Sequence, residues 1–246
     1  MDDIFAVVDN AVRKANGSTH PREVADCNHV LVGEPLTGSI IGMAMRFSTL
    51  GVIAVNERLK DIWVLLTLWH ELAHVLLGHV DEPSFNFHRD NGIFTQSIDS
   101  KTLSRQEKEA NLIAAEYSVD TARVLDLIGY NNRTMQDYRQ LKTAQDALLK
   151  AYNNLRFSSY ADHLPASIKR QLTEFRDAFM ELEERKNNLE AELAAMHCFK
   201  TFDEIAADLE IDVVILKYKL EALRMRRYDI EVQELEHYSK VFRNAK

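Results

Sequence analysis

Glycine, proline and cysteine are all scarce in this chain, and each shortage excludes a class of protein. The 246 residues include 8 glycines and 4 prolines. That is too few for a sandwich of many short strands and tight turns, so we expect long helices. The two cysteines, Cys27 and Cys198, cannot form a disulfide framework and indicate reduced thiols in a cytosolic protein. A hydrophobic content of 46% excludes an intrinsically disordered chain.

An excess of basic charge and long apolar runs are also lacking. The net charge is −8, so no global positive field draws the protein to nucleic acid or to an acidic membrane surface. The longest apolar run, Ile62 to Trp69, is interrupted at Thr67 and is far shorter than the roughly 20 residues of a membrane span. The N-terminus does not have the pattern of a secretory signal. We therefore expect a cytoplasmic protein.

The first 130 residues combine helices with a small β-sheet. Alternating or continuous apolar residues predict three strands. Apolar residues at helical spacing predict an amphipathic helix, a central helix that is apolar on every face and buried, and a third helix after a long polar loop. The expected strands are 29–36, 39–47 and 51–55, the expected helices are 2–14, 60–80 and 104–128, and the loop is 81–100.

Long charged helices dominate the sequence after residue 130. From Pro165 to Met196, apolar residues keep alternating spacings of four and three, and a similar seam lies in the preceding helix. The short connection between them favours an antiparallel helical hairpin. The alternative is an intermolecular coiled coil through the same seam, which would make the protein a homo-oligomer.

Two short helices are expected near the C-terminus. Thr201 to Glu204 form a capping box, and a turn at residues 210–212 separates the helix that follows from a second helix at 213–227. This is a helix-turn-helix pattern. The second helix is rich in cations that either contact DNA, the weaker alternative in an acidic chain, or lie in a packing and substrate-docking element. These cations are Lys217, Lys219, Arg224, Arg226 and Arg227.

A His-Glu-x-x-His sequence at residues 70–74 lies within the expected central helix. Residues four apart share one face of a helix, so His70 and His74 can both reach one Zn²⁺. Glu71 lies beside them, where its carboxylate can accept a proton from water that the metal activates. Two core histidines with only a packing role are the alternative, and the helical context favours the zinc site.

The third ligand that catalytic zinc requires is expected from the next helix, which offers Glu107, Glu109 and Asn111. Glu107 and Asn111 are four residues apart, so one could bind the metal while the other hydrogen-bonds a ligating imidazole. However, Ser104 and Glu107 also match a capping box, in which the glutamate folds back onto its own helix. Helical position does not separate Glu107 from Glu109, because they flank the apolar face on opposite sides.

His79 follows the motif at a spacing that does not suit a ligand. At about 100° per residue it lies roughly half a turn from His70. We therefore expect it to face away from the metal and to act as a cation at the end of the helix.

Three segments of the chain, taken in order, resemble the ImmA/IrrE family of metallopeptidases. They are the strand at residues 51–56, the helix with residues 70–79, and Glu107-Lys108-Glu109-Ala110-Asn111 with the residues that follow. The resemblance covers about residues 1–130. After this last helix the family usually has a Leu-Leu-Met-Pro-like run, where this chain reads Tyr117-Ser118-Val119-Asp120, and its minimal unit lacks the hairpin.

The resemblance implies an α+β, zincin-like metallopeptidase domain at residues 1–130, followed here by a helical hairpin at 131–199 and a helix-turn-helix-like region at 200–246. It implies Glu71 as the general base and Zn²⁺ as the cofactor. The implied ligands are His70, His74 and Glu107, with Glu109 as the alternative third ligand and Asn111 as a hydrogen-bonding partner. His88 and Tyr117 are candidates for stabilising an oxyanion.

Members of this family are typically encoded by phages and mobile elements or act in bacterial stress responses, and they cleave helix-turn-helix repressors. The resemblance therefore implies a zinc endopeptidase whose partner is a protein substrate, a transcriptional repressor. The alternative is a non-catalytic antirepressor, in which the metal site is structural or vestigial. The presence of Glu71 favours catalysis, because a structural metal site needs no general base.

Overall fold

The computed structural model describes residues 3–56, 58–80, 103–157, 165–195, 200–226, 228 and 230, together with the backbone of residues 85–89. The chain forms two compact units, one from residues 1–121 and 202–234 and the other from residues 122–201 and 235–246. The first unit thus combines the N-terminal part with the C-terminal helices. The division at residues 130 and 199 stays a prediction.

A small sheet lies at one side of the first unit. It consists of β1 (Val30–Val32), β2 (Ile40–Phe47), β3 (Leu50–Val55) and β4 (Phe85–Arg89), in the order β1-β3-β2-β4. β1 pairs in parallel with β3, whereas β2 is antiparallel to both β3 and β4. The three expected strands are confirmed, although β1 is shorter than predicted.

The prediction of a continuous loop over residues 81–100 is wrong at β4. Phe85-Asn86-Phe87-His88 alternates between apolar and polar residues, but the pattern is short and is surrounded by residues typical of loops. Its strand conformation comes from hydrogen bonds with β2, more than 35 residues away in sequence. Local patterns carry little information on such non-local pairing.

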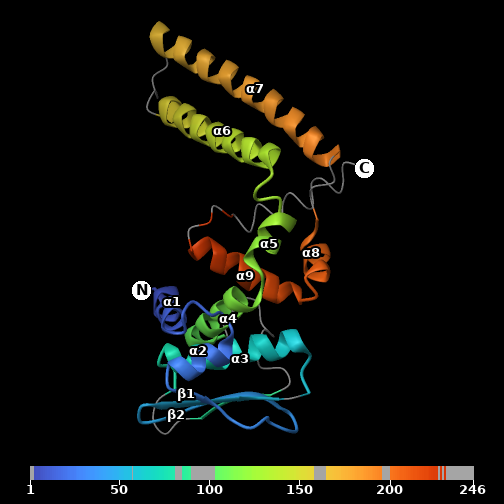
Figure 1. The fold of residues 1–246 in the computed structure, drawn as a ribbon. Helices are drawn as coiled ribbons and strands as arrows, with labels where there is room; N and C mark the ends of the chain where they lie inside the picture. The colour runs from blue at the N-terminus through green and yellow to red at the C-terminus, as the bar shows by residue number, and fades with distance from the viewer. Residues whose placement is uncertain are drawn as a thin grey trace. The chain divides into compact units, whose positions relative to one another are not determined.

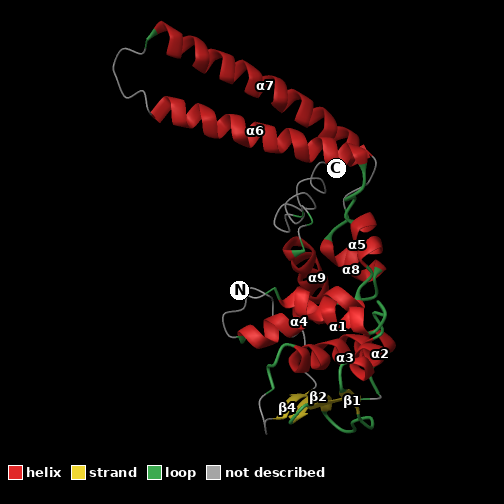
Figure 2. Ribbon diagram, turned by 60° about the vertical axis from the view of Figure 1, so that its left-hand side comes forward, coloured by secondary structure: helices red, strands yellow, loops and turns green. Residues whose placement is uncertain are grey.

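Four helices cover one face of the sheet in layers (Figure 2). They are α1 (Ile4–Lys14), α2 (Pro21–Cys27), α3 (Asp61–Leu76) and α4 (Arg105–Ser118). α3 packs against β2 and β3, and α4 packs against α3. Leu66, Trp69 and Leu72 of α3 have no exposed surface, which confirms the expected buried central helix. α2 was not expected from the sequence.

The helix predicted over residues 104–128 is interrupted. α4 ends at Ser118, Val119 has an extended backbone with φ −103° and ψ 127°, and α5 (Thr121–Leu127) follows. α4 therefore belongs to the first unit, whereas nearly all of α5 belongs to the second.

The C-terminal helices α8 (Phe202–Asp208) and α9 (Val213–Met225) complete the first unit. Four residues join them, among which Glu210 has a φ of 57°. Asp212 caps α9 by accepting a hydrogen bond from the backbone N–H of Val214 at 2.8 Å. The pair of helices expected here is confirmed, and α9 packs against α4 (Figure 1).

The second unit contains α5 and a long antiparallel pair, α6 (Arg133–Phe157) and α7 (Ala166–Ala195). Thr134 hydrogen-bonds Glu192, and Tyr138 hydrogen-bonds Glu190 at 2.8 Å, so the partner number falls as the residue number rises. The antiparallel hairpin is thus confirmed (Figure 1), and the α+β class holds for the whole chain. In the described part of the chain, no helix has the length and hydrophobicity that crossing a membrane requires.

Candidate metal centre

α3 carries the two histidines into the interior of the first unit. His70, Glu71 and His74 have no exposed surface. The histidines are four residues apart on one face of α3, and their Nε2 atoms lie 3.1 Å apart. Two imidazole nitrogens that face each other in the core have the arrangement that a shared metal ion requires.

α4 adds a carboxylate to this pair. The oxygens of Glu107 lie 3.4 Å from Nε2 of His70 and 3.5 Å from Nε2 of His74. Glu107 lies in the first turn of α4, where its backbone N–H donates to the hydroxyl of the N-cap, Ser104. The cap therefore fixes the backbone of Glu107 while the carboxylate points at the histidines.

The spacing of these three residues fits a tetrahedral metal site. Ligand atoms held about 2.0–2.1 Å from a zinc ion in a tetrahedron lie about 3.3 Å from one another. The separations of 3.1, 3.4 and 3.5 Å are close to this value. Among the described residues, His70, His74 and Glu107 form the one such group that could hold a metal ion.

Glu71 lies against Gly42 of strand β2. A Cβ atom on Gly42 of β2 would stand 2.2 Å from Oε1 of Glu71 and 2.7 Å from Cγ2 of Thr67. Only glycine leaves room for the glutamate in this position. The sequence analysis missed Gly42, although a glycine inside a strand is a known sign of close approach by another group.

The chain also matches a known protein family. A family model described as peptidase M78, the IrrE N-terminal-like domain, matches residues 28–152, about half of the chain. The chain belongs to the IrrE N-terminal-like family. This family suggests a metallopeptidase, and the buried cluster suits such an activity. Searches of curated proteins and of solved structures gave no match.

Glu109, the alternative third ligand, contacts His79 instead of the two cluster histidines. In this member of the IrrE N-terminal-like family, Oε2 of Glu109 lies 3.1 Å from Nε2 of His79, and Oε1 lies 2.6 Å from Nε of Arg105. Nδ1 of His79 in turn lies 3.2 Å from Nδ1 of His74. Glu109 is therefore connected to the cluster through one imidazole ring, that of His79.

The expectation that His79 faces away as a cation is wrong. α3 ends at Leu76, and Gly78 has a φ of +71°, which turns the chain back toward the helix. The rotation of 100° per residue therefore does not extend to His79. Burial and then the nearby His74 lower the pKa of His79, against the opposing effect of Glu109, so the ring suits a neutral hydrogen-bonding role.

The contacts of His79 indicate which ring nitrogens of His74 and His79 carry a hydrogen when His74 binds a metal. For Nε2 of His74 to bind a metal, its Nδ1 must carry the hydrogen, which donates to Nδ1 of His79. Nε2 of His79 then donates to Glu109. Such carboxylate–histidine contacts orient metal ligands in many proteins.

Asn111 is buried one turn after Glu107, with 2% of its surface exposed. Its Oδ1 atom accepts no hydrogen bond within the described parts of the chain. The predicted hydrogen bond from Asn111 to a ligating imidazole stays a prediction. The side chain of His88 lies outside the described residues.

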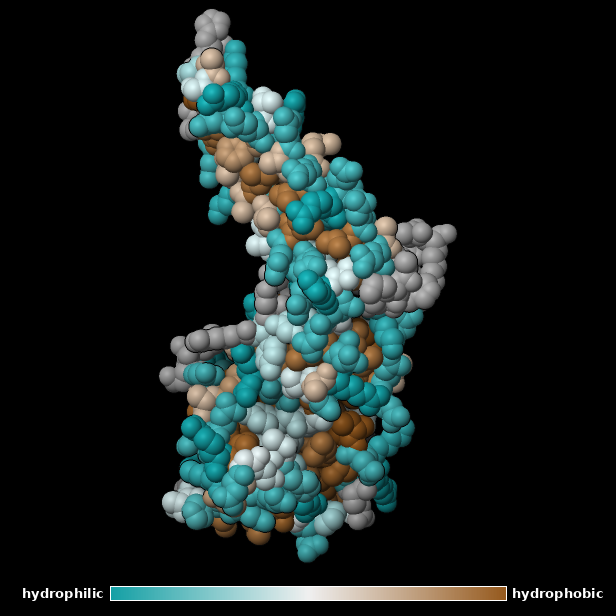
Figure 3. Space-filling view, turned by 45° about the horizontal axis from the view of Figure 1, so that its top comes forward, coloured by the Kyte–Doolittle hydropathy of each residue, from teal (hydrophilic) through white to brown (hydrophobic). Residues whose placement is uncertain are grey.

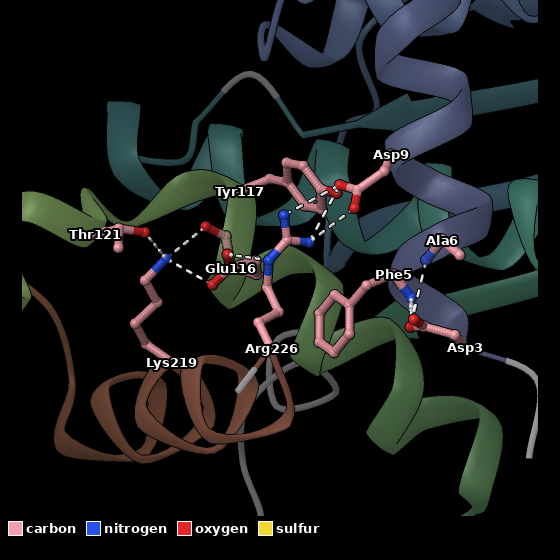
Figure 4. Close-up of polar contacts among 9 residues, drawn as sticks. All are labelled: Asp3, Phe5, Ala6, Asp9, Glu116, Tyr117, Thr121, Lys219 and Arg226. Carbon is pink, nitrogen blue, oxygen red and sulfur yellow. Dashed lines mark hydrogen bonds and ion pairs between the residues drawn. The ribbon is translucent and has the colours of Figure 1, made fainter. Parts of the chain in front are cut away.

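Outside the matched range of the IrrE N-terminal-like domain, α9 places a buried lysine against α4. Nζ of Lys219 lies 2.7 Å from the backbone oxygen of Glu116, 2.8 Å from its Oε2 and 2.8 Å from Oγ1 of Thr121 (Figure 4). All three donors of the ammonium are thus satisfied. Burial lowers the pKa of Lys219, although Glu116 acts in the opposite direction.

Arg226, directly after α9, extends this contact to α1. Its guanidinium donates to both carboxylate oxygens of Asp9 at 3.1 to 3.2 Å, and its Nε lies 3.2 Å from Oε1 of Glu116 (Figure 4). The hydroxyl of Tyr117 also donates to Asp9, so it serves the contact with α1 and does not support the predicted oxyanion role. Burial, followed by Asp9, raises the pKa of Tyr117. The Tyr117 ring stacks on Trp69, the residue before His70, with centroids 4.7 Å apart.

The cations expected on α9 are largely engaged within the first unit. Lys219 has no exposed surface, Arg226 pairs with two carboxylates, and Arg224 donates to Glu221 at 2.8 Å. Arg227 lies outside the described residues. α9 therefore does not present these side chains as an open row of charges for phosphate groups.

Proposed function

We propose that this protein is a zinc endopeptidase that hydrolyses a peptide bond in a specific protein substrate, a helix-turn-helix transcriptional repressor. One observation carries the catalytic part: Glu107 lies within 3.5 Å of the Nε2 atoms of both buried histidines, and Glu71 lies beside them on α3. The substrate class rests on the family resemblance alone.

The cluster and the residues beside it have separate roles in the proposed hydrolysis. Zinc, when bound by His70, His74 and Glu107, would polarise the scissile carbonyl and acidify a water molecule. Glu71 acts as the general base, taking a proton from the attacking water and passing it to the leaving amine. Gly42 leaves the space in which the Glu71 carboxylate makes this transfer.

The sheet offers a way to hold an extended substrate. β4 is one of the two edge strands of the described sheet, and His88 on β4 pairs with Gly42, the residue against Glu71. An extended peptide that adds to the outer edge of β4 gains backbone hydrogen bonds without needing a particular sequence. Its specificity would then come from contacts elsewhere on the protein.

Co-expression with a helix-turn-helix repressor encoded beside this gene tests the proposal. We expect repressor fragments with the wild-type protein and intact repressor with Glu71→Gln, because the amide keeps the shape of the side chain but cannot accept the proton. Glu23→Gln, at an exposed position of helix α2, is the matched control and should leave cleavage unchanged. Equal fragmentation with wild type and Glu71→Gln would contradict the proposal.

The same experiment distinguishes a protease from the alternative, a non-catalytic antirepressor. A binding protein would relieve repression without any fragments, and Glu71→Gln would relieve it as well as the wild type. Zinc content, measured on the purified proteins, should be the same for both, so that loss of metal cannot account for the difference.

A further inference from the structure

The outer half of the α6–α7 hairpin, formed by the C-terminal half of α6 and the N-terminal half of α7, carries an apolar surface that the two helices do not bury. We name it the outer patch, and it consists of Leu148, Leu149, Tyr152, Phe175 and Phe179. These residues, together with Arg176, line a mostly apolar groove of about 120 Å³. Leu149 is 44% exposed, and the other four are half-buried.

The two ends of the hairpin differ in how well they are packed. At the inner end, Met135, Tyr138 and Leu193 form a cluster with at most 3% of their surface exposed. Among the described residues of the outer half, no apolar side chain is as deeply buried. Figure 3 shows hydrophobic side chains running along the hairpin between hydrophilic ones. Two helices alone cannot enclose a continuous apolar seam, because each helix covers the other on one side only.

We propose that a second copy of this chain covers the outer patch, so that two hairpins form a four-helix bundle around a two-fold axis along their length. Such an axis places each outer patch against its own copy and lays α6 of one chain across α7 of the other. The contact is then isologous, the form found in most homodimers.

The charges of the two helices suit this pairing. α6 carries five basic and two acidic residues, whereas α7 carries five basic and seven acidic residues. A positive helix therefore crosses a negative one at both contacts of the bundle. A strongly basic or strongly acidic partner would meet one favourable and one unfavourable helix.

The length of the hairpin is also sufficient for a stable dimer. The 25 residues of α6 span about 38 Å at 1.5 Å per residue. Two adjacent helices about 10 Å in diameter make a face about 20 Å wide, so the face measures roughly 750 Å² per copy. Specific protein interfaces bury about 800 Å² per partner.

Sedimentation of the full-length protein over about a hundredfold range of concentration tests the proposal. We expect twice the 28.3 kDa mass of one chain for the wild type and the mass of one chain for Leu149→Glu, which would place two charges in the dimer interface. Ala147→Glu adds the same charge to the opposite, exposed face of α6 and should remain dimeric.

Circular dichroism should show the same helical content for the two variants, because both positions are exposed. Phe179→Ser serves as a second variant on α7 and should also abolish the dimer. A wild type that stays monomeric over the whole range would overturn the proposal, as would dimers of equal strength in Leu149→Glu and Ala147→Glu. A chain that is monomeric alone but binds a repressor through the outer patch would overturn it too.

Discussion

Gly42 lets β2 approach α3 so closely that no side chain fits between the strand and Glu71. In Gly42→Ala, the new methyl group would stand 2.2 Å from Oε1 of Glu71, so the carboxylate must move. A displacement of about 1 Å in a catalytic group can reduce the rate by about a hundredfold. We expect such a loss of substrate cleavage with zinc content unchanged, measured on the purified variant.

Gly51→Ala is the matched control for this prediction. Its methyl group would stand 2.5 Å from Cγ1 of Val75 on the same helix, so it should destabilise the fold by about 1–3 kcal/mol without a selective loss of activity. If both variants lose stability and activity in the same proportion, Gly42 has no special role at Glu71.

The third ligand can be decided by two substitutions that differ only in position. Glu107→Gln removes the carboxylate that faces both histidines, and we expect it to abolish tight zinc binding. Glu109→Gln changes the contacts with His79 and Arg105 but touches neither cluster histidine, and we expect it to weaken zinc binding by about 10-fold, as for other groups behind metal ligands. Competition with a chromogenic chelator measures both affinities. Loss of zinc in Glu109→Gln alone would make our assignment wrong.

The sequence predicted the members of this site better than their surroundings. His70 and His74 were evident because residues four apart share a helical face, which is a local rule. The choice of Glu107 over Glu109 was open, since it depends on how α4 packs against α3. Gly42 and His79 were missed or misplaced for a similar reason, because one acts through the spacing of β2 and α3 and the other through a turn at Gly78.

α9 is bound to α4 mainly through charged groups that are out of water. Lys219→Met keeps the length of the side chain but leaves Glu116, whose side chain is only 8% exposed, with Arg226 alone. Removing one partner of a buried ion pair typically costs about 3–5 kcal/mol. We expect a loss near the lower end, because Arg226 remains, measured by urea unfolding. Lys217→Met, on the same helix but half-buried, should cost less than about 1 kcal/mol.

An equal loss of stability in Lys217→Met and Lys219→Met would contradict this account of α9. Retained stability in Lys219→Met together with lost binding to DNA would favour the other interpretation of the helix, as a recognition helix. Glu116→Gln should resemble Lys219→Met, because it breaks the same pair from the other side.

Elements were predictable from the sequence where their pattern is long. α6 and α7 follow from apolar spacings sustained over many residues, and α3 follows from a long segment that is apolar on every face. β4 and the break between α4 and α5 could not be predicted in this way. The strand depends on pairing with β2, and the break at Val119 falls where Lys219 binds Glu116 and Thr121 on either side of it. Both are decided by contacts between segments that are distant in sequence.

The first unit as a whole draws its residues from both ends of the chain. Asp9 near the N-terminus and Arg226 near the C-terminus meet beside Tyr117, whose ring stacks on the residue before the first metal-site histidine. The metal centre and the C-terminal helices therefore belong to one folding unit, and the stability of that unit should respond to the metal.

Zinc should stabilise the whole first unit, because the cluster that binds it exists only in the folded state. At a free zinc concentration a hundredfold above Kd, the expected gain is about 2.7 kcal/mol, or roughly 5–10 °C in Tm for a domain of this size. Calorimetry with and without a chelator measures this difference. Glu107→Gln should unfold at the same temperature in both conditions, and Glu71→Gln should keep most of the shift. A shift of wild-type size in Glu107→Gln would show that the ion binds elsewhere.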